Sequence, residues 1–276
     1  MNFLTWGTDP WGQEVLIRIS WDLLYVASVL GILFVGAHAV WLAFFVQEEA
    51  EAVDEAALAG VPEKVARHSL ASRVFHWVMA AAMLALLLTG FLPVIGIQFP
   101  WVTIHWVAGV VLTLSVIYHT IHATFWLGLS AMLVGPKDIS DAVSRFKRSI
   151  GQDAPAPRKH GKYPLENRLY HHAITLTGGL VIVTGILMMF RIDTPLWARD
   201  PYIFTDPTWG MIYVVHGLSA VSLVTLVIAH IYFGIRPEKR WITWSMVWGW
   251  IDRRHYVEHH DPEQWAARSE GSSGQR

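Results

Sequence analysis

The sequence contains no cysteine among its 276 residues. Iron–sulfur clusters with cysteine ligands, covalently attached c-type haem and disulfide bonds are therefore excluded. Charged residues are scarce, at 16% of the chain, whereas a soluble domain contains about a quarter. The net charge of −1 gives no sign of a strongly basic surface, so we expect no nucleic-acid partner.

The common catalytic patterns are absent as well. The sequence has no Ser-His-Asp arrangement, no paired carboxylates and no phosphate-binding glycine loop, and its Asp and Glu residues are nearly confined to the segments between apolar runs. We therefore predict no catalytic residues in this chain. A redox role would have to depend on histidine-ligated cofactors, and the sequence supplies 14 histidines.

Apolar residues are abundant: they make up 53% of the chain, which includes 15 Trp. Uncharged runs long enough to cross a bilayer occupy residues 23–47, 74–136, 169–190 and 207–235. The second run is too long for one crossing, and Pro93 and Pro100 divide it into two helices. The sequence therefore predicts an all-α integral membrane protein with five transmembrane helices.

The loops predict the orientation. Residues 137–168 carry eight Lys or Arg against four Asp or Glu, and the segment after Ile235 begins RPEKR. Positively charged loops stay in the cytoplasm. We therefore expect a cytoplasmic C-terminus and, with five crossings, a periplasmic N-terminus. Within the first of these segments, DISDAVSRFKRSI has the apolar spacing of an amphipathic helix at the inner interface.

Histidines recur at matching depths in the predicted helices. His216 and His230 are fourteen residues apart on one helix, so they share a face at a separation of about 21 Å. His105 and His76 each lie near one end of another helix. The predicted topology pairs His105 with His216 near the outer face and His76 with His230 near the inner face. Two b-type haems, each held by two imidazoles, would need such pairs.

Other interpretations of the histidines remain open. A single intramembrane histidine can simply bond a backbone carbonyl. His119 lies fourteen residues after His105 and rivals His76 for the inner iron. The surplus of inner-side histidines leaves room for a third haem, with candidates His38, His119, His122, His171 and His172. For the histidines in polar segments, a solvated or partner-facing surface is the better explanation; these are His160, His255, His259 and His260.

A function from another class is a proton or metal transporter that uses intramembrane histidines. This hypothesis predicts acidic partners within the spans, and the runs contain none. A purely structural membrane anchor would have no need of histidines at two depths.

The motifs RVFHW, LLLTGF, IHWVAG, VTGILM, VHGLSA and AHIYFGI follow one another between Arg73 and Trp265. In content and order they resemble the gamma, cytochrome b subunits of respiratory formate dehydrogenases and related membrane-anchored oxidoreductases. The resemblance implies a four-helix core with two haems b, whose ligands would be the same two histidine pairs. It divides the chain into an extra N-terminal transmembrane helix (1–50), an acidic cytoplasmic linker (51–72), the di-haem core (73–240) and a cytoplasmic tail (241–276).

The resemblance also implies partners and a location. A quinone, menaquinone or ubiquinone, would bind near the inner haem, where KYPLENRLYHH offers Asn167, His171 and His172 as candidates. The electron donor would be a periplasmic subunit of the iron–sulfur or multihaem cytochrome c type, with the primary substrate chemistry in that other chain. The reverse direction, from quinol to a periplasmic reductase, is the alternative. The chain would lie among the lipids of a bacterial cytoplasmic (inner) membrane.

Overall fold

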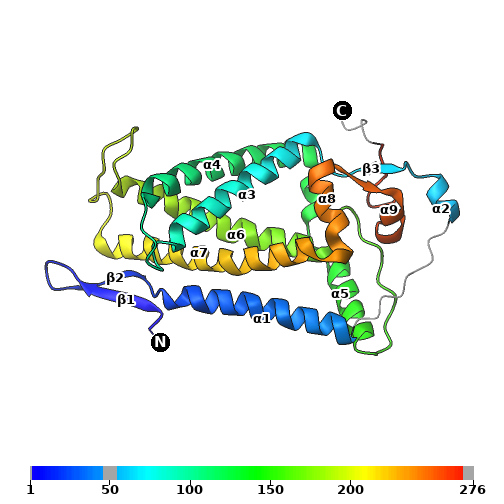
Figure 1. Ribbon diagram of the computed structural model, residues 1–276, viewed down its shortest axis with the longest axis horizontal. Coiled ribbons are helices and arrows are strands. Elements are labelled where there is room, and N and C mark those ends of the chain that lie inside the picture. Colours follow the sequence, from blue (N-terminus) through cyan, green and yellow to red (C-terminus); the bar gives the residue numbers. More distant parts are fainter. Residues whose placement is uncertain (1, 46–54, 270–276) are drawn as a thin grey trace. The chain divides into compact units, whose positions relative to one another are not determined.

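The structure is a computed structural model that describes residues 2–45 and 55–269. It is mostly helical, and its long helices are α1 (Asp22–Phe45), α3 (Leu70–Phe91), α4 (Trp101–His122), α6 (Leu165–Met188) and α7 (Asp206–Ile235) (Figure 1). All five are long and apolar enough to cross a membrane. The prediction of five transmembrane helices is confirmed. The start of the predicted acidic linker (51–72), residues 51–54, lies outside the described residues.

The helix ends follow from local chemistry. α3 ends at Phe91, two residues before Pro93, and α4 begins immediately after Pro100, because proline cannot continue a helix but is tolerated at its start. Pro164 likewise precedes α6. After α4 the chain continues as a π-helical turn, Ala123–Leu127. Three short 3-10 helices cover Leu129–Met132, Met189–Arg191 and Pro237–Lys239.

The chain forms two compact units. Unit 1 comprises Met1–Phe34, Val78–Ile117 and His172–His230, and unit 2 comprises Val35–Trp77, Tyr118–His171 and Ile231–Arg276. Each long helix contributes one segment to each unit.

Unit 1 contains an antiparallel hairpin of β1 (Leu4–Thr8) and β2 (Glu14–Ile19), drawn in blue in Figure 1. The hairpin packs closely on α7. A Cβ atom added at Gly210 would lie 1.8 Å from the Leu16 carbonyl oxygen, and one at Gly217 would lie 2.8 Å from the Ile19 side chain. Ile19 joins a core with Ala27, Val214 and Val221. The sequence analysis did not predict these strands.

Unit 2 contains the smaller elements. α5 (Pro136–Ser149) is the predicted amphipathic helix, which is confirmed. The remaining elements are α2 (Glu55–Ala59), β3 (Lys64–Ala66), α8 (Arg240–Trp248), β4 (Trp250–Asp252) and α9 (Arg253–His259). β3 and β4 pair antiparallel. Val65, Ile251 and Tyr256 form the core of this unit, with Trp241 and Trp265 packed against it.

Candidate functional site

Two of the predicted iron ligands face each other in unit 1. His105 projects from α4 and His216 from α7, and the centres of their rings lie 6.4 Å apart with an angle of 61° between the ring planes. The two residues are separated by more than a hundred positions in the sequence. The structure therefore brings together one of the two histidine pairs that the sequence predicted.

A threonine orients each of these rings. The Thr89 hydroxyl lies 2.8 Å from His105 Nδ1 and 2.6 Å from the Ala85 carbonyl oxygen. The Thr184 hydroxyl lies 2.9 Å from His216 Nδ1 and 2.6 Å from the Leu180 carbonyl oxygen.

In both cases the carbonyl can only accept, so the hydroxyl donates to it and accepts from the imidazole Nδ1–H. The proton is thereby held on Nδ1, and the lone pair of Nε2 is left for a metal. The two imidazoles are thus presented in the tautomer that an iron ligand needs.

A glycine follows each threonine and lies under the same ring. A Cβ atom added at Gly90 would be 3.6 Å from His105 Cε1, and one at Gly185 would be 3.4 Å from His216 Cε1. The Thr-Gly dipeptides of α3 and α6 therefore position the two imidazoles: the threonine bonds Nδ1 and the glycine leaves room for the ring. The two dipeptides lie in the motifs LLLTGF and VTGILM, which entered above only as part of the resemblance to a family. The Thr-Gly dipeptide that both motifs contain was the signal for this role. Gly217, by contrast, packs on Ile19 of the hairpin.

The spacing of His105 and His216 suits a bis-imidazole iron. Two metal–nitrogen bonds of ~2 Å, with ~1 Å more from each nitrogen to its ring centre, amount to ~6 Å. The observed separation of 6.4 Å agrees with this requirement. The donor set also fits, since both ligands are neutral imidazoles with oriented Nε2 atoms.

A second pair of imidazoles meets in unit 2. His119 of α4 and His171 of α6 have ring centres 6.2 Å apart at an angle of 60°. Phe75 stacks on His119 with a centre distance of 4.3 Å and an angle of 6°. His119, the predicted rival for the inner iron, thus lies beside one of the predicted quinone candidates.

The other predicted ligands and quinone candidates lie on three helices, α3, α6 and α7, and in both units. His76 belongs to unit 2, next to Phe75, while His230 is the last residue in its segment of unit 1. The pairing of His76 with His230 stays a prediction. Asn167 lies in the first turn of α6 and His171 one turn later, and the exposed His172 follows.

His38 and His122 both have aromatic surroundings in unit 2. His38 Nδ1 lies 3.1 Å from the Tyr232 hydroxyl, and the ring meets Phe233 edge to face. His122 stacks between Tyr118 and Trp126. Ordinary packing and hydrogen bonding explain these contacts, which do not by themselves indicate iron ligands.

The prediction of a solvated or partner-facing surface is wrong for His260. This side chain is 1% exposed, and its Nδ1 lies 2.7 Å from the Gly161 carbonyl oxygen. Arg67, also buried, donates to its Nε2 at 3.2 Å. Burial, followed by the charge of Arg67, lowers the pKa of His260 to about 3, so the neutral ring accepts this hydrogen bond. The segment after α8 packs against the rest of unit 2 and buries His260, although its polar sequence neighbours predicted an exposed side chain.

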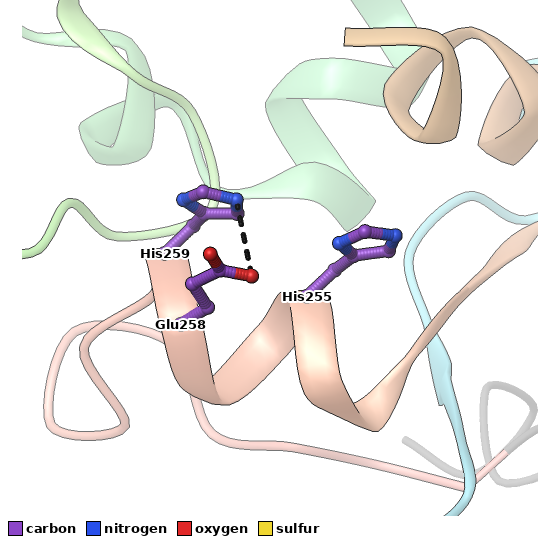
Figure 2. Close-up of side chains that lie close together, drawn as sticks. All are labelled: His255, Glu258 and His259. Atoms are coloured by element: carbon purple, nitrogen blue, oxygen red, sulfur yellow. Dashed lines mark ion pairs between the residues drawn. The ribbon is translucent and has the colours of Figure 1, made fainter. Parts of the chain in front are cut away.

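The sequence analysis missed a group of potential metal ligands on α9. His255, Glu258 and His259 each offer a ligand atom, and these atoms lie within 4.8 Å of one another (Figure 2). The spacing i, i+3, i+4 places all three on one face of the helix. That spacing was the available signal.

Long apolar helices carrying a pair of oriented imidazoles define the class of membrane cytochromes with b-type haem. The family model for prokaryotic cytochrome b561 matches residues 67–249. The chain belongs to this family. The match covers α3, α4, α6 and α7 and begins after α1.

A characterised relative supports the assignment. The cytochrome b556 subunit of formate dehydrogenase from Haemophilus influenzae is 24% identical over 214 residues, which cover 71% of this chain and 81% of the relative. The predicted relationship to formate dehydrogenase cytochrome b subunits is confirmed. The chain is a multi-pass membrane cytochrome b with a role in electron transfer.

Proposed function

We propose that this chain carries electrons between a redox enzyme partner and a quinone by means of two haems b. The observation that carries the proposal is the His105 and His216 pair, at 6.4 Å and with both Nδ1 atoms hydrogen bonded to threonines. A haem iron between two imidazoles accepts and releases single electrons. The surrounding apolar helices exclude water from this centre.

His76 and His230 are the proposed ligands of the second haem. His230 follows His216 by fourteen residues on the same face of α7, about 21 Å further along the axis. Residues 73–240 would form the di-haem core, with residues 1–50 as an additional helix and residues 241–276 as a tail. The family match, which begins at residue 67, supports this division.

The second ligand pair can be tested by substitution. His76→Ala and His230→Ala should each remove one haem and leave the other, because each iron loses one axial imidazole. His119→Ala should leave both haems in place. The measurement is haem per protein, by the pyridine haemochrome spectrum. Loss of a haem in His119→Ala, with none lost in His76→Ala, would transfer the ligand role to His119.

The proposed quinone site is at the start of α6. His171 and His119 lie together there, with ring centres 6.2 Å apart, and Asn167 lies one turn before His171. Reduction of a quinone requires a proton donor on each carbonyl oxygen as negative charge develops there. A histidine titrates in the physiological range and can supply that proton, while the Asn167 amide can orient the carbonyl.

The quinone site predicts a kinetic effect. His172→Leu, His171→Leu or Asn167→Leu should slow oxidation of the dithionite-reduced haems by a water-soluble quinone by about 10²-fold or more, the usual contribution of a positioned proton donor. Stopped-flow absorbance measures the rate. Thr177→Val is the control on the same helix, since the Thr177 hydroxyl donates to the Ala173 and Ile174 carbonyl oxygens of α6 itself. Equal rates in all variants would move the quinone site away from α6.

The partner and orientation complete the proposal. The named relative is a subunit of formate dehydrogenase, which supports a redox enzyme partner that performs the primary chemistry. The cationic segment 137–168 favours a cytoplasmic location for that loop, with a periplasmic N-terminus and a periplasmic electron donor in a bacterial inner membrane. Electron flow inward to the quinone would build membrane potential. Quinol oxidation by the same site, toward a periplasmic reductase, is the second direction.

A further inference from the structure

α9 of unit 2 presents three potential metal ligands that the electron-transfer role does not use. His255, Glu258 and His259 lie at positions i, i+3 and i+4 of this helix, and Figure 2 shows their side chains on the same side of it. Their ligand atoms lie within 4.8 Å of one another. His259 Nε2 lies 3.7 Å from Glu258 Oε2.

These separations are near those of a metal centre. Zinc binds imidazole nitrogen and carboxylate oxygen at ~2.0–2.2 Å in a tetrahedral arrangement, which places neighbouring ligand atoms ~3.4 Å apart. Binding would draw the three ligand atoms together from the observed limit of 4.8 Å. Two histidines four residues apart on one face of a helix form a spacing that zinc-binding helices use.

Trp241 of α8 holds both rings. It stacks on His255 with a centre distance of 5.1 Å and an angle of 14°, and on His259 at 5.3 Å and 0°. The two imidazoles are consequently nearly parallel, 14° apart. Such support restricts their rotation, as the surroundings of metal-binding histidines commonly do.

The hydrogen bonds also leave His255 available. Its Nδ1 atom is buried and has no hydrogen-bond partner within the part of the chain that the structure describes. A buried polar atom of this kind costs free energy unless a further group satisfies it. A metal ion bound by this face of α9 is one such group.

The neighbouring charges permit a cation. Glu258 and His259 line a pocket of about 240 Å³ whose rim includes Arg158, Lys159 and Lys239. Arg145 lines the same pocket. Of the other cations, Arg158 pairs with Asp141 at 2.7 Å, Lys159 donates to the Val257 carbonyl oxygen, and Lys239 lies 3.8 Å from Glu166. The pocket leaves room for water or a small anion as a fourth ligand.

We propose that His255, Glu258 and His259 bind one divalent transition-metal ion of the zinc class. Three protein ligands leave one coordination position open, as in sites that exchange a ligand, whereas structural zinc sites use four. The site does not depend on either haem.

The test is zinc binding to the full-length, haem-loaded protein purified without a histidine tag. The protein is equilibrated with buffered free Zn²⁺, and bound zinc per chain is measured by inductively coupled plasma mass spectrometry. We expect one zinc per chain. His255→Ala, His259→Ala and Glu258→Gln should each weaken binding at least tenfold. Glu263→Gln, a matched change of an exposed glutamate in the same tail, should have no effect.

Haem content, measured in the same samples, separates this proposal from the electron-transfer role. It should be unchanged in all four variants, which shows that the fold is intact. No zinc bound by the wild-type protein at micromolar free Zn²⁺ would overturn the proposal. Equal binding by the wild-type protein, His255→Ala and His259→Ala would overturn it as well.

Discussion

At the residue scale, the threonines set the chemistry of the imidazoles. The Thr184 hydroxyl accepts a hydrogen bond from His216 Nδ1–H and donates one to the Leu180 carbonyl oxygen. The hydrogen bond makes the imidazole a stronger ligand and fixes the direction of Nε2. Thr89 does the same for His105. An apolar residue of the same shape would leave Nδ1–H without this acceptor.

Thr184→Val should therefore weaken retention of the haem between His105 and His216, by about 10- to 100-fold in affinity. Loss of haem to apomyoglobin measures the change. Thr177→Val is the matched control, because its hydroxyl makes the same type of bond to the Ala173 carbonyl oxygen and, within the described residues, bonds no histidine. Equal retention in the two variants would show that the threonine hydroxyl has no part in holding the ligand.

At the scale of elements, glycines decide how closely the helices approach the imidazoles. Gly185 lies under His216, and Gly90 lies under His105. Gly178 on the same helix as Gly185 has nothing within 4 Å of an added Cβ. Gly178 and Gly185 each follow a threonine on α6, but only Gly185 lies against a histidine ring.

We expect Gly185→Val to displace the His216 ring and reduce occupancy of its haem, because the two γ carbons extend beyond a Cβ that already lies 3.4 Å from Cε1. Gly178→Val should keep both haems. The reduced-minus-oxidised spectrum, scaled to protein, checks both variants. Full occupancy in Gly185→Val would mean that the close approach has no role in haem binding.

The elements also show which features the sequence could predict. Hydropathy finds α1, α3, α4, α6 and α7, because each contains a long uncharged run and their ends carry proline or charge. The β1–β2 hairpin was missed. Its turn could have been predicted, since Asp9 accepts hydrogen bonds from the Trp11 and Gln13 amides and Gly12 has a φ of 83°. The position of the hairpin could not, because it depends on contact with Gly210 of α7.

The candidate site was predictable to a similar degree. Depth and spacing were enough to select His105 and His216, since intramembrane histidines are rare and costly. The Thr-Gly seats and the His119 and His171 pair depend on which helices are neighbours, and a single sequence does not give this. His260 was placed at the surface because the segment around it is polar, yet it is buried beside Arg67.

At the scale of the whole molecule, the chain is a membrane cytochrome b in which α4 and α7 bring one oriented histidine pair together, His105 and His216. The match to the prokaryotic cytochrome b561 family supports a role in electron transfer. A transporter that relays protons or metal ions through histidines would need no haem. Haem content therefore separates the two functions.

The most direct measurement is the haem-to-protein ratio of the purified chain and of His216→Ala, from the pyridine haemochrome spectrum. The account predicts a ratio of two for the wild-type protein and one for the variant, with the remaining haem still reducible by dithionite. Removing His216 takes away one axial ligand of a single iron, so only one haem should be lost. A wild-type protein without haem, or a variant that keeps its full complement, would contradict the account.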